Sequence, residues 1–404
     1  MINKKKIVLI TTGQPSCNPR IVKEADCLSI AGYEVLVLYS FFIDWAQEKD
    51  ESLLKNVLWN FRMLGGNKNE NKLLYFYTRL RFKISRILNK YIGNKFLLAE
   101  RAQARSYDEL LREAKNIKAD WYIGHNLGSL SIAVRAAKHN KAKAGFDFED
   151  YHRGEGIDKN TLERIIFLER KYVPFLSYYT TASELITKST TINHSNFVGK
   201  VITILNCFPL SQQTAFLEKV FTDHTLRLFW FSQTIGLNRG IELLLEALKI
   251  INNKSISLTL AGRCNDDLKA FINQNYNELY ANIDYAAIIQ PENLPAFASQ
   301  FDVGMAIELK KPFNRDICLT NKIFTYLLAG NAMILSNTAM QSSFNDHYNV
   351  GQIYVAGDAE SLAEKIIFYL DTKKLNEQKK HNYELAKNTL NWEQESKKLL
   401  EIIS

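Results

Sequence analysis

Two successive α/β units, each built around its own parallel sheet, are predicted from three features of the 404-residue sequence. Short apolar runs alternate with helical patterns along both halves of the chain, and a polar segment around Asn206 and Pro209 separates the halves. The length also exceeds what one ordinary hydrophobic core contains. Because such alternation is typical of doubly wound sheets, we expect two Rossmann-like domains that face each other across a cleft.

The first half supplies one series of strands and helices. Its expected strands are short apolar runs, and its expected helices carry apolar residues on one face. The strands are predicted at Lys6–Thr11, Tyr33–Tyr39, Trp121–Gly124, Ala144–Phe148, Tyr178–Ala182 and Val201–Leu205, and the helices at Pro19–Ala31 and Ser129–His139.

The second half repeats the pattern. A final amphipathic helix, Trp392–Ile403, follows the last predicted unit of strand and helix. The strands are predicted at Leu226–Phe231, Ile256–Ala261, Tyr285–Ile289, Val303–Ile307 and Ala332–Leu335, and the helices at Gly240–Ile251, Leu294–Ser299, Lys322–Ala329 and Ser361–Leu370.

The composition indicates a globular protein with anionic partners. Hydrophobic residues make up 46% and aromatic residues 12% of the chain, which excludes a disordered protein. The net charge is +8, from 51 Lys and Arg against 43 Asp and Glu, and it favours nucleotides, nucleic acid or an acidic membrane surface as partners.

Cellular location is predicted from the cysteines and the apolar runs. The five cysteines are scattered without a CxxC pair, which is typical of reduced thiols in the cytoplasm. The run Ile7–Ile10 is too short for a signal peptide, and no segment approaches the roughly 20 apolar residues of a membrane span. We expect a cytoplasmic protein, attached at most to the inner face of a membrane.

The segment Leu73–Leu98 does not fit the alternation. It interleaves bulky apolar residues with cations, has no acid, and predicts a basic amphipathic helix interrupted at Gly93. One interpretation is attachment to an anionic membrane surface; the other is a helix packed on its domain with solvated basic residues. Nucleic acid is disfavoured because no nucleic-acid-binding motif accompanies the charge. The cations are Arg79, Arg81, Lys83, Arg86, Lys90 and Lys95.

A phosphate site is predicted at the start of the helix within Leu319–Gly330. Thr320 and Asn321 open this helix, Lys322 stands in its first turn, and Gly330 ends it. The unpaired amides of a helix start favour an anion. A lysine at this positive end is unfavourable unless an anion compensates it, so Lys322 indicates a phosphate ligand.

Two glycine-containing turns follow predicted strands and offer further ligand contacts. Gly236 and Arg239 lie between a strand and a helix, and Arg239 suits bidentate contact with phosphate oxygens. Gly13 follows the first strand and lets the backbone approach a ligand, although an ordinary turn between strand and helix has the same appearance and no full GxGxxG is present. Arg239 and Lys322 together form a candidate pair of cations.

Polar residues after other strands are candidates for chemistry on the substrate. His125 and Asn126 follow a strand at the edge where doubly wound sheets bind ligands; a histidine there can stabilise developing charge, or it can be an incidental loop residue. A group after the next strand would crowd the same edge as an acceptor site or a base, and its spacing fits no standard metal site. This group comprises Asp147, Glu149, Asp150, His152 and Glu155.

Two acids of the second half, Glu308 and Asp316, are candidates for binding ribose or sugar hydroxyls. Glu308 directly follows the predicted strand Val303–Ile307. Solvated loop acids are the competing interpretation of both residues.

Taken together, these segments resemble the GT-B glycosyltransferases, most closely the family 4 type. The resemblance covers nearly the whole chain, with the segments in the family's order. It rests on TTGQPSCNPRIVKEADCLSIAGYEV, YIGHNLGSLSIAVRAA, SQTIGLNRGIELLLEAL, FDVGMAIE, PFNRDICLTNKIFTYLLAGNAMILS and the terminal helix that begins at Trp392.

The resemblance implies a retaining hexosyltransferase that needs no metal and no cofactor besides its nucleotide-sugar donor. It implies an acceptor domain at 1–205, which binds a glycan or a lipid-linked acceptor, a donor domain at 206–385, and a helix at 386–404 that packs back on the first domain. Surface polysaccharide synthesis is the expected pathway. The implied donor-binding residues are Gly13, Arg239, Asn321, Lys322, Asp316 and Thr325, and the implied catalytic residues are His125 and Glu308.

Two departures from the family pattern bear on the donor. The family's basic group before its KG turn is replaced by Ser232 and Gln233, and the ribose-binding glutamate of K-x-x-E-Y is Thr325 here. Asp316 or Glu308 must then substitute, or donor binding is weaker. A nucleotide-sugar epimerase of the same fold and a non-catalytic binding or scaffold protein are the alternatives.

Overall fold

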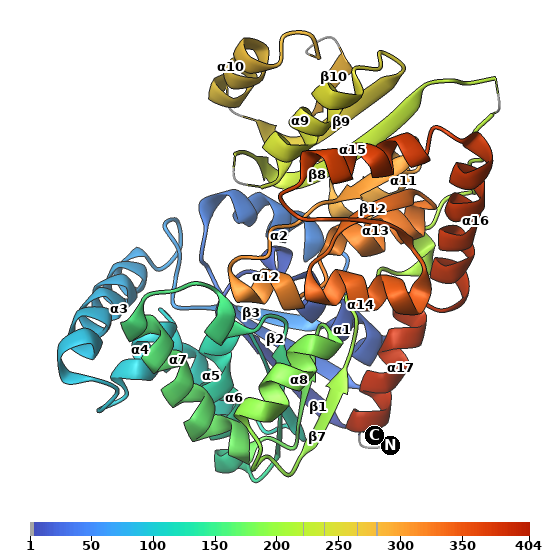
Figure 1. Ribbon diagram of the computed structural model, residues 1–404. Helices are drawn as coiled ribbons and strands as arrows, with labels where there is room; N and C mark the ends of the chain where they lie inside the picture. Colours follow the sequence, from blue (N-terminus) through green and yellow to red (C-terminus); the bar gives the residue numbers. More distant parts are fainter. Residues whose placement is uncertain (1–3, 221, 238, 265, 280–281) are drawn as a thin grey trace. The chain divides into compact units, whose positions relative to one another are not determined.

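The chain divides into two compact units in the computed structural model, which describes residues 4–220, 222–237, 239–264, 266–279 and 282–404. The first unit runs up to Ile204 and is completed by Lys398–Ser404; the second spans Leu205–Lys397. Each unit contains one parallel sheet flanked by helices (Figure 1). The two predicted Rossmann-like sheets are therefore confirmed.

The first sheet contains, within the described residues, seven parallel strands in the order β3-β2-β1-β4-β5-β6-β7. Its strand order changes direction between β1 and β4, and ligands of doubly wound sheets bind at the carboxyl ends beside such a switch point. The strands are β1 (Lys6–Thr11), β2 (Glu34–Ser40), β3 (Asn60–Leu64), β4 (Trp121–His125), β5 (Lys143–Phe148), β6 (Tyr178–Thr181) and β7 (Lys200–Thr203).

Apolar side chains of the central strands form the core of the first unit. Ile7, Val8, Leu9 and Ile10 of β1 are all fully buried, as expected for a strand covered on both faces. The flanking helices are α1 (Pro19–Ile30), α2 (Gln47–Leu53), α3 (Lys72–Ile92), α4 (Leu98–Gln103), α5 (Tyr107–Asn116), α6 (Leu127–Asn140), α7 (Lys159–Tyr172) and α8 (Glu184–Asn193).

The second sheet repeats this topology with six parallel strands among the residues that the structure describes, in the order β10-β9-β8-β11-β12-β13. Its switch point lies between β8 and β11. The strands are β8 (Leu226–Ile235), β9 (Ile256–Cys264), β10 (Ile283–Ala286), β11 (Val303–Ala306), β12 (Ala332–Ser336) and β13 (Gly351–Tyr354).

The helices of the second unit end with α17, whose last residues belong to the first unit. There, Lys398 Nζ donates to the Thr203 carbonyl oxygen and Lys5 Nζ to that of Ser404. The helices are α9 (Ile241–Ile251), α10 (Asp266–Asn275), α11 (Leu294–Ala298), α12 (Phe313–Ile317), α13 (Asn321–Ala329), α14 (Ala339–Tyr348), α15 (Ala359–Phe368), α16 (Thr372–Asn388) and α17 (Trp392–Ile403).

Helix α13, which carries Lys322, is fixed to the sheet by one tyrosine. Tyr326 is fully buried and its hydroxyl donates to the Phe229 carbonyl oxygen of β8, 3.0 Å away. Gly304 of β11 permits this approach, because a Cβ atom there would lie 2.2 Å from the Tyr326 ring. Gly330 ends the helix at φ 70°, as predicted.

Two strand predictions in the second half need correction. Strand β8 continues past Phe231 to Ile235 after a register irregularity between Phe231 and Thr234, so Ser232 and Gln233 lie in a strand rather than in a turn. Strand β10 starts two residues before the predicted Tyr285 and ends before Ile289, because its apolar anchor is Ile283 at the base of the sheet.

The edge strands β3 and β13 and the long helix α16 were not predicted from the sequence. Strand β3 is only five residues long and includes the polar Asn60 and Arg62, so it lacks the continuous apolar run of the central strands. Within the described residues, none of the helices combines the length and the apolar character that crossing a membrane requires.

Candidate functional site

Two predicted site residues of each unit lie at the carboxyl edge of its sheet, beside the switch point. In the first unit, Gly13 follows β1 and His125 ends β4. In the second, Arg239 follows β8 and Glu308 follows β11. The topology therefore places each pair on neighbouring strands where ligands of this sheet class bind.

In the second unit, the ends of β8 and β11 and the start of α13 lie together. Gly240, next to Arg239, faces Ile307, since a Cβ atom on Gly240 would lie 3.4 Å from the Ile307 Cδ1 atom. Lys322 Nζ lies 5.4 Å from the ring centre of Trp230 in β8. The Trp230 face supplies additional stabilisation to the ammonium group.

The anion that compensates Lys322 is Glu308. Lys322 Nζ donates to Glu308 Oε1 at 2.8 Å, and the two side chains are only 15% and 13% exposed. Glu308 is held in turn by its backbone N–H, which donates to Ser336 Oγ at 2.6 Å. Lys322 therefore does not need an external anion, contrary to the prediction, because Glu308 supplies the compensating charge; any phosphate ligand would have to compete with Glu308.

Arg239 is exposed and directly precedes Gly240, the residue before α9. Its guanidinium donates to Ser232 Oγ at 3.1 Å. Its neighbour Asn238, which belongs to the same turn of the sequence prediction, lies outside the described residues. A hydroxyl is a weak partner for a guanidinium, so Arg239 retains donors for an anion.

Three further predicted donor residues have different surroundings. Asn321 is exposed and accepts a hydrogen bond from Asn206 Nδ2 at 2.7 Å. Asp316 accepts the Ala339 N–H at the start of α14, 2.9 Å away. Thr325 is fully buried within α13, and its Oγ1 atom has no hydrogen-bond partner among the described residues.

In the first unit, Asn126 joins the two loops at the switch point. Its Oδ1 accepts from Thr12 Oγ1 and its Nδ2 donates to Thr11 Oγ1, each at 2.7 Å. Asn126 itself has φ 61° and ψ 154°, a backbone conformation that costs about 1–3 kcal/mol outside glycine. Gly13, which Asn126 thereby positions, is open: a Cβ atom there would meet none of the described atoms within 4 Å.

His125 is fully buried in a cluster of charges. Its Nε2 atom lies 2.9 Å from Glu24 Oε2, and its Nδ1 atom lies 3.5 Å from Asp147 Oδ2. Arg20 makes a bidentate contact with Asp147 at 2.7 Å for each bond, and Thr180 Oγ1 donates to the same carboxylate. His125 therefore contacts other charged side chains directly behind the edge of the sheet.

These contacts set the protonation of the cluster. Burial disfavours the charged histidine, but Glu24 and Asp147 outweigh it and raise the pKa of His125 to about 9. Burial disfavours the Asp147 carboxylate, yet Arg20 and His125 hold its pKa well below the usual range. Burial raises the pKa of Glu149, the second residue after Asp147, to about 7. The edge thus carries one carboxyl group that changes charge near neutral pH.

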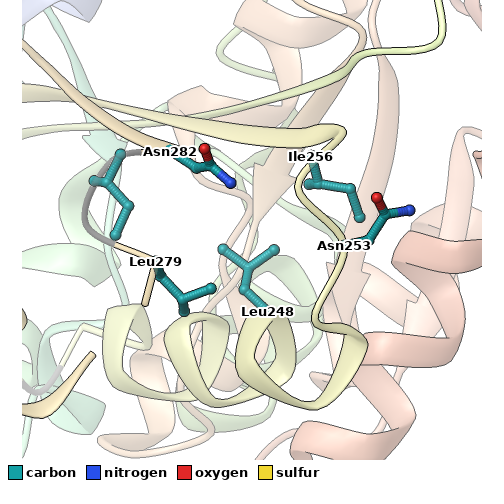
Figure 2. A pocket seen from close by; sticks show the side chains of 6 residues that line it. Leu248, Asn253, Ile256, Leu279 and Asn282 are labelled. Carbon is teal, nitrogen blue, oxygen red and sulfur yellow. The ribbon is translucent and has the colours of Figure 1, made fainter. Parts of the chain in front are cut away.

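Two cavities differ in what they can hold. A hollow of about 380 Å³ lies in the first unit near the ends of β2 and β3; aromatic Tyr39, Phe41 and Phe61 line it together with Gln14 and Asp50. This size and lining match small-molecule sites. Figure 2 shows a much smaller cavity, about 10 Å³ between α9 and the amino ends of β9 and β10, which has room for roughly one water and lies away from the ligand-binding edge.

Several residues of these sites were not predicted from the sequence. Arg20 and Glu24 stand four residues apart on α1 and both are buried; charged residues on the same face as Ile21 and Leu28 were the available signal. The sequence gives no indication that Trp230 lies beneath Lys322, because an apolar residue in a strand ordinarily belongs to the hydrophobic core. Among the described residues, no group of three or more His, Cys, Asp or Glu is arranged to hold a metal ion.

Comparison with known proteins gives the fold. No family model and no curated protein sequence matches the chain. Solved structures match over nearly full length. Anabaena HepE in complex with UDP and glucose has a TM-score of 0.68 at 12% identity, covering 99% of each chain. A Rickettsia africae glycosyltransferase has a TM-score of 0.65 at 13% identity, covering 99% of this chain and 98% of its own. WaaG, a glycosyltransferase involved in lipopolysaccharide biosynthesis, has a TM-score of 0.62 at 10% identity, covering 98% of this chain and 99% of its own.

The chain has the GT-B fold. The family resemblance in the sequence and the two doubly wound sheets agree on this point. At these identities the likeness establishes the GT-B fold alone, and the chemistry depends on the residues at the two switch points.

Proposed function

We propose that this protein is a glycosyltransferase that moves a sugar from a nucleotide-sugar donor to a glycan or lipid-linked acceptor. The observation that carries the proposal is the grouping of Lys322, Arg239 and Glu308 at the switch point of the second sheet. Two cations and the amides of a helix start suit the diphosphate of such a donor. The solved GT-B structures include one bound to UDP and glucose, which makes UDP-sugars the first donors to test.

In the proposed reaction, Lys322 and Arg239 stabilise the charge that develops on the leaving diphosphate. The donor's phosphate displaces the Glu308 carboxylate from Lys322, and Glu308 is then released toward the sugar hydroxyls. Transfer proceeds with retention, without a metal ion or a further cofactor, and in the cytoplasm, where it serves surface polysaccharide synthesis. Asn321 and Asp316 remain candidates for the ribose, whereas Thr325 would reach it only if α13 moved.

The first unit is proposed to bind the acceptor. The hollow lined by Tyr39 and Phe61, and Glu149 with a pKa near 7, support this assignment, whereas the open Gly13 loop remains a candidate for contact with the donor. His125, predicted from the resemblance to act on the sugar, is enclosed by Glu24 and Asp147. We assign it a positioning role through the neighbouring Asn126.

A panel of UDP- and GDP-sugars tests the proposal. Thermal unfolding should shift upward with at least one nucleotide sugar, because ligand binding stabilises the folded state. The same mixtures, incubated with and without glycan acceptors, should give transfer only with acceptor, and NMR of the product should show the donor's anomeric configuration. Conversion of the sugar without acceptor would instead identify an epimerase, and the absence of any thermal shift would support a non-catalytic protein.

A further inference from the structure

Helix α3 packs on the first unit through its polar side and exposes its apolar side. Figure 1 shows it at the margin of the unit beside α4. Its buried residues are Tyr75, Thr78, Ser85 and Asn89, which are spaced three, seven and four positions apart and form one stripe. Three of these four are polar, so the packed face lacks the apolar character that a domain helix normally buries.

Polar contacts attach this stripe to the rest of the unit. Arg81 makes two hydrogen bonds to the Glu109 carboxylate, at 2.9 and 2.5 Å. Arg105 donates to Thr78 Oγ1, and Arg164 Nη1 donates to Asn89 Oδ1 at 3.3 Å. The attachment of α3 therefore uses polar contacts and the buried Tyr75, whose ring centre lies 5.8 Å from that of Phe41, and not the large apolar side chains that remain exposed.

Those apolar side chains form a continuous exposed face on the opposite side of the helix. Leu73 is 88% exposed, Leu80 58% and Tyr91 78%. These three residues are seven and eleven positions apart, which places them along one side of α3. The α3 apolar face comprises Leu73, Phe76, Tyr77, Leu80, Ile84, Ile87, Leu88 and Tyr91.

Cations form a flank beside the α3 apolar face. The α3 basic flank comprises Lys72, Arg79, Lys83, Arg86 and Lys90, which follow the same helical spacing, and no acidic residue occurs between Asn71 and Ala99. A helix with an apolar face and a basic flank matches a bilayer, whose acyl boundary takes the apolar side chains while anionic headgroups take the cations.

The loop after α3 extends this surface. Phe96 and Leu97 both adopt left-handed backbone conformations, with φ 53° and 62°, which bulky residues rarely occupy. The result is that Phe96 stands 79% exposed beside Lys95. An exposed aromatic ring next to a cation thus combines apolar and basic groups as α3 does. This loop feature does not follow from the helical spacing of α3.

We propose that α3 and the loop to Phe96 form a docking surface for an anionic lipid bilayer. The helix lies in the plane of the interface, with the α3 apolar face in the acyl boundary and the α3 basic flank at the lipid phosphates. The charge complementarity selects a lipid surface over a second copy of this chain, since two copies would bring their basic flanks together. The proposal does not depend on the glycosyl-transfer function.

Vesicle co-sedimentation of the full chain tests this proposal. The protein should bind phosphatidylcholine vesicles that contain phosphatidylglycerol, bind pure phosphatidylcholine vesicles far less, and dissociate from the anionic vesicles at high salt. The triple variant Lys83→Gln, Arg86→Gln, Lys90→Gln should lower the partition coefficient on the order of a hundredfold. The matched control Lys373→Gln, Lys380→Gln, Lys387→Gln, on exposed positions of α16, should bind as the native chain does.

A second variant tests the apolar contribution. The variant Leu80→Ser, Ile84→Ser, Ile87→Ser should lose at least tenfold in binding while unfolding at the native temperature, since these side chains are exposed. Equal binding to neutral and anionic vesicles, or no binding to either, would overturn the proposal. A different result would assign the α3 apolar face to a second copy of this chain: the native chain self-associates in sedimentation but does not bind vesicles, and the serine variant does not self-associate. That result would overturn the proposal.

Discussion

The switch points of the two sheets share one topology but arrange their charges in opposite ways. In the first unit, Arg20, Asp147, His125 and Glu24 are buried and neutralise one another behind the sheet edge. In the second, Lys322 has one carboxylate partner and Arg239 is exposed. Charged residues at a ligand-binding edge thus either stabilise the strand ends or bind a ligand. Their degree of burial and the number of their oppositely charged partners distinguish these two roles.

The largest expected effect comes from breaking the buried cluster. Replacing Asp147 by Asn removes the negative charge that compensates Arg20 and His125, so the free energy of unfolding should fall by about 3–5 kcal/mol. Urea unfolding measures this change. The control Glu364→Gln, at an exposed position of α15, should stay within about 0.5 kcal/mol of the native chain. A native-like midpoint for Asp147→Asn would show that the cluster does not stabilise the unit.

Replacing the cation Lys322 in the second unit should lower the rate of sugar transfer rather than the stability of the fold. Lys322→Gln keeps a hydrogen-bond donor for Glu308 but no positive charge for a diphosphate. We expect kcat/KM for transfer to fall about 10²–10³-fold, by analogy with the loss of one charge-stabilising donor. Lys254→Gln, an exposed lysine before the amino end of β9, is the matched control and should be active. Full activity of Lys322→Gln would remove Lys322 from the proposed site.

The pH dependence of the free energy of unfolding should reflect the buried charge cluster of the first unit. The pKa of His125 is raised to about 9, so its contribution is complete below its unfolded value of 6.5 and is lost as the pH rises through 9. The loss amounts to about 3 kcal/mol for a shift of this size. Thermal or urea unfolding across this pH range measures it, and His125→Gln should flatten the profile. A stability that rises from pH 6.5 to 9 would contradict the ion pairs of the cluster.

The smallest expected effect shows whether Glu308 competes with the donor diphosphate for Lys322 or itself contacts the donor. Because Glu308 occupies Lys322, the variant Glu308→Gln should bind a nucleoside diphosphate about fivefold more tightly, which corresponds to about 1 kcal/mol for one weak ion pair. Calorimetry with UDP and GDP measures this affinity. If Glu308 also binds the sugar, the same variant should transfer sugar more slowly. Weaker diphosphate binding by Glu308→Gln would show that Glu308 supports the cation instead of competing for it.

The strands at the centre of each sheet were predictable because their signal is local. Lys6–Thr11 is observed with the predicted bounds, since an unbroken apolar run between a basic start and a glycine turn admits few alternatives. The edge strand β3 escaped prediction because Asn60 and Arg62 leave it without the continuous apolar run that marks the central strands. Strand ends are harder still: β8 extends to Ile235 through pairing with β9, which no local pattern encodes.

The residue types of the site and the sheet edge at which they lie were predictable from the sequence. The side chains that each of these residues contacts were not. Spacing along the chain placed Lys322 at a helix start and His125 at a strand end, and both positions are observed. It could not show that Glu308 reaches Lys322, or that Arg20 and Glu24 of α1 reach the end of β4 and β5, because these partners meet only through the tertiary fold. The partners decide whether a charge is available to a ligand.

The end of α17 ties the completion of the first unit to the synthesis of the second. Residues Lys398–Ser404 are translated after the whole of Leu205–Lys397, yet they belong to the first unit and bury Ile403 fully there. The emerging amino-terminal half therefore lacks part of its final packing until the second half has left the ribosome. A nascent first unit would expose this apolar surface to chaperones, and a nonsense mutation near codon 397 would damage the half of the protein that had been made first.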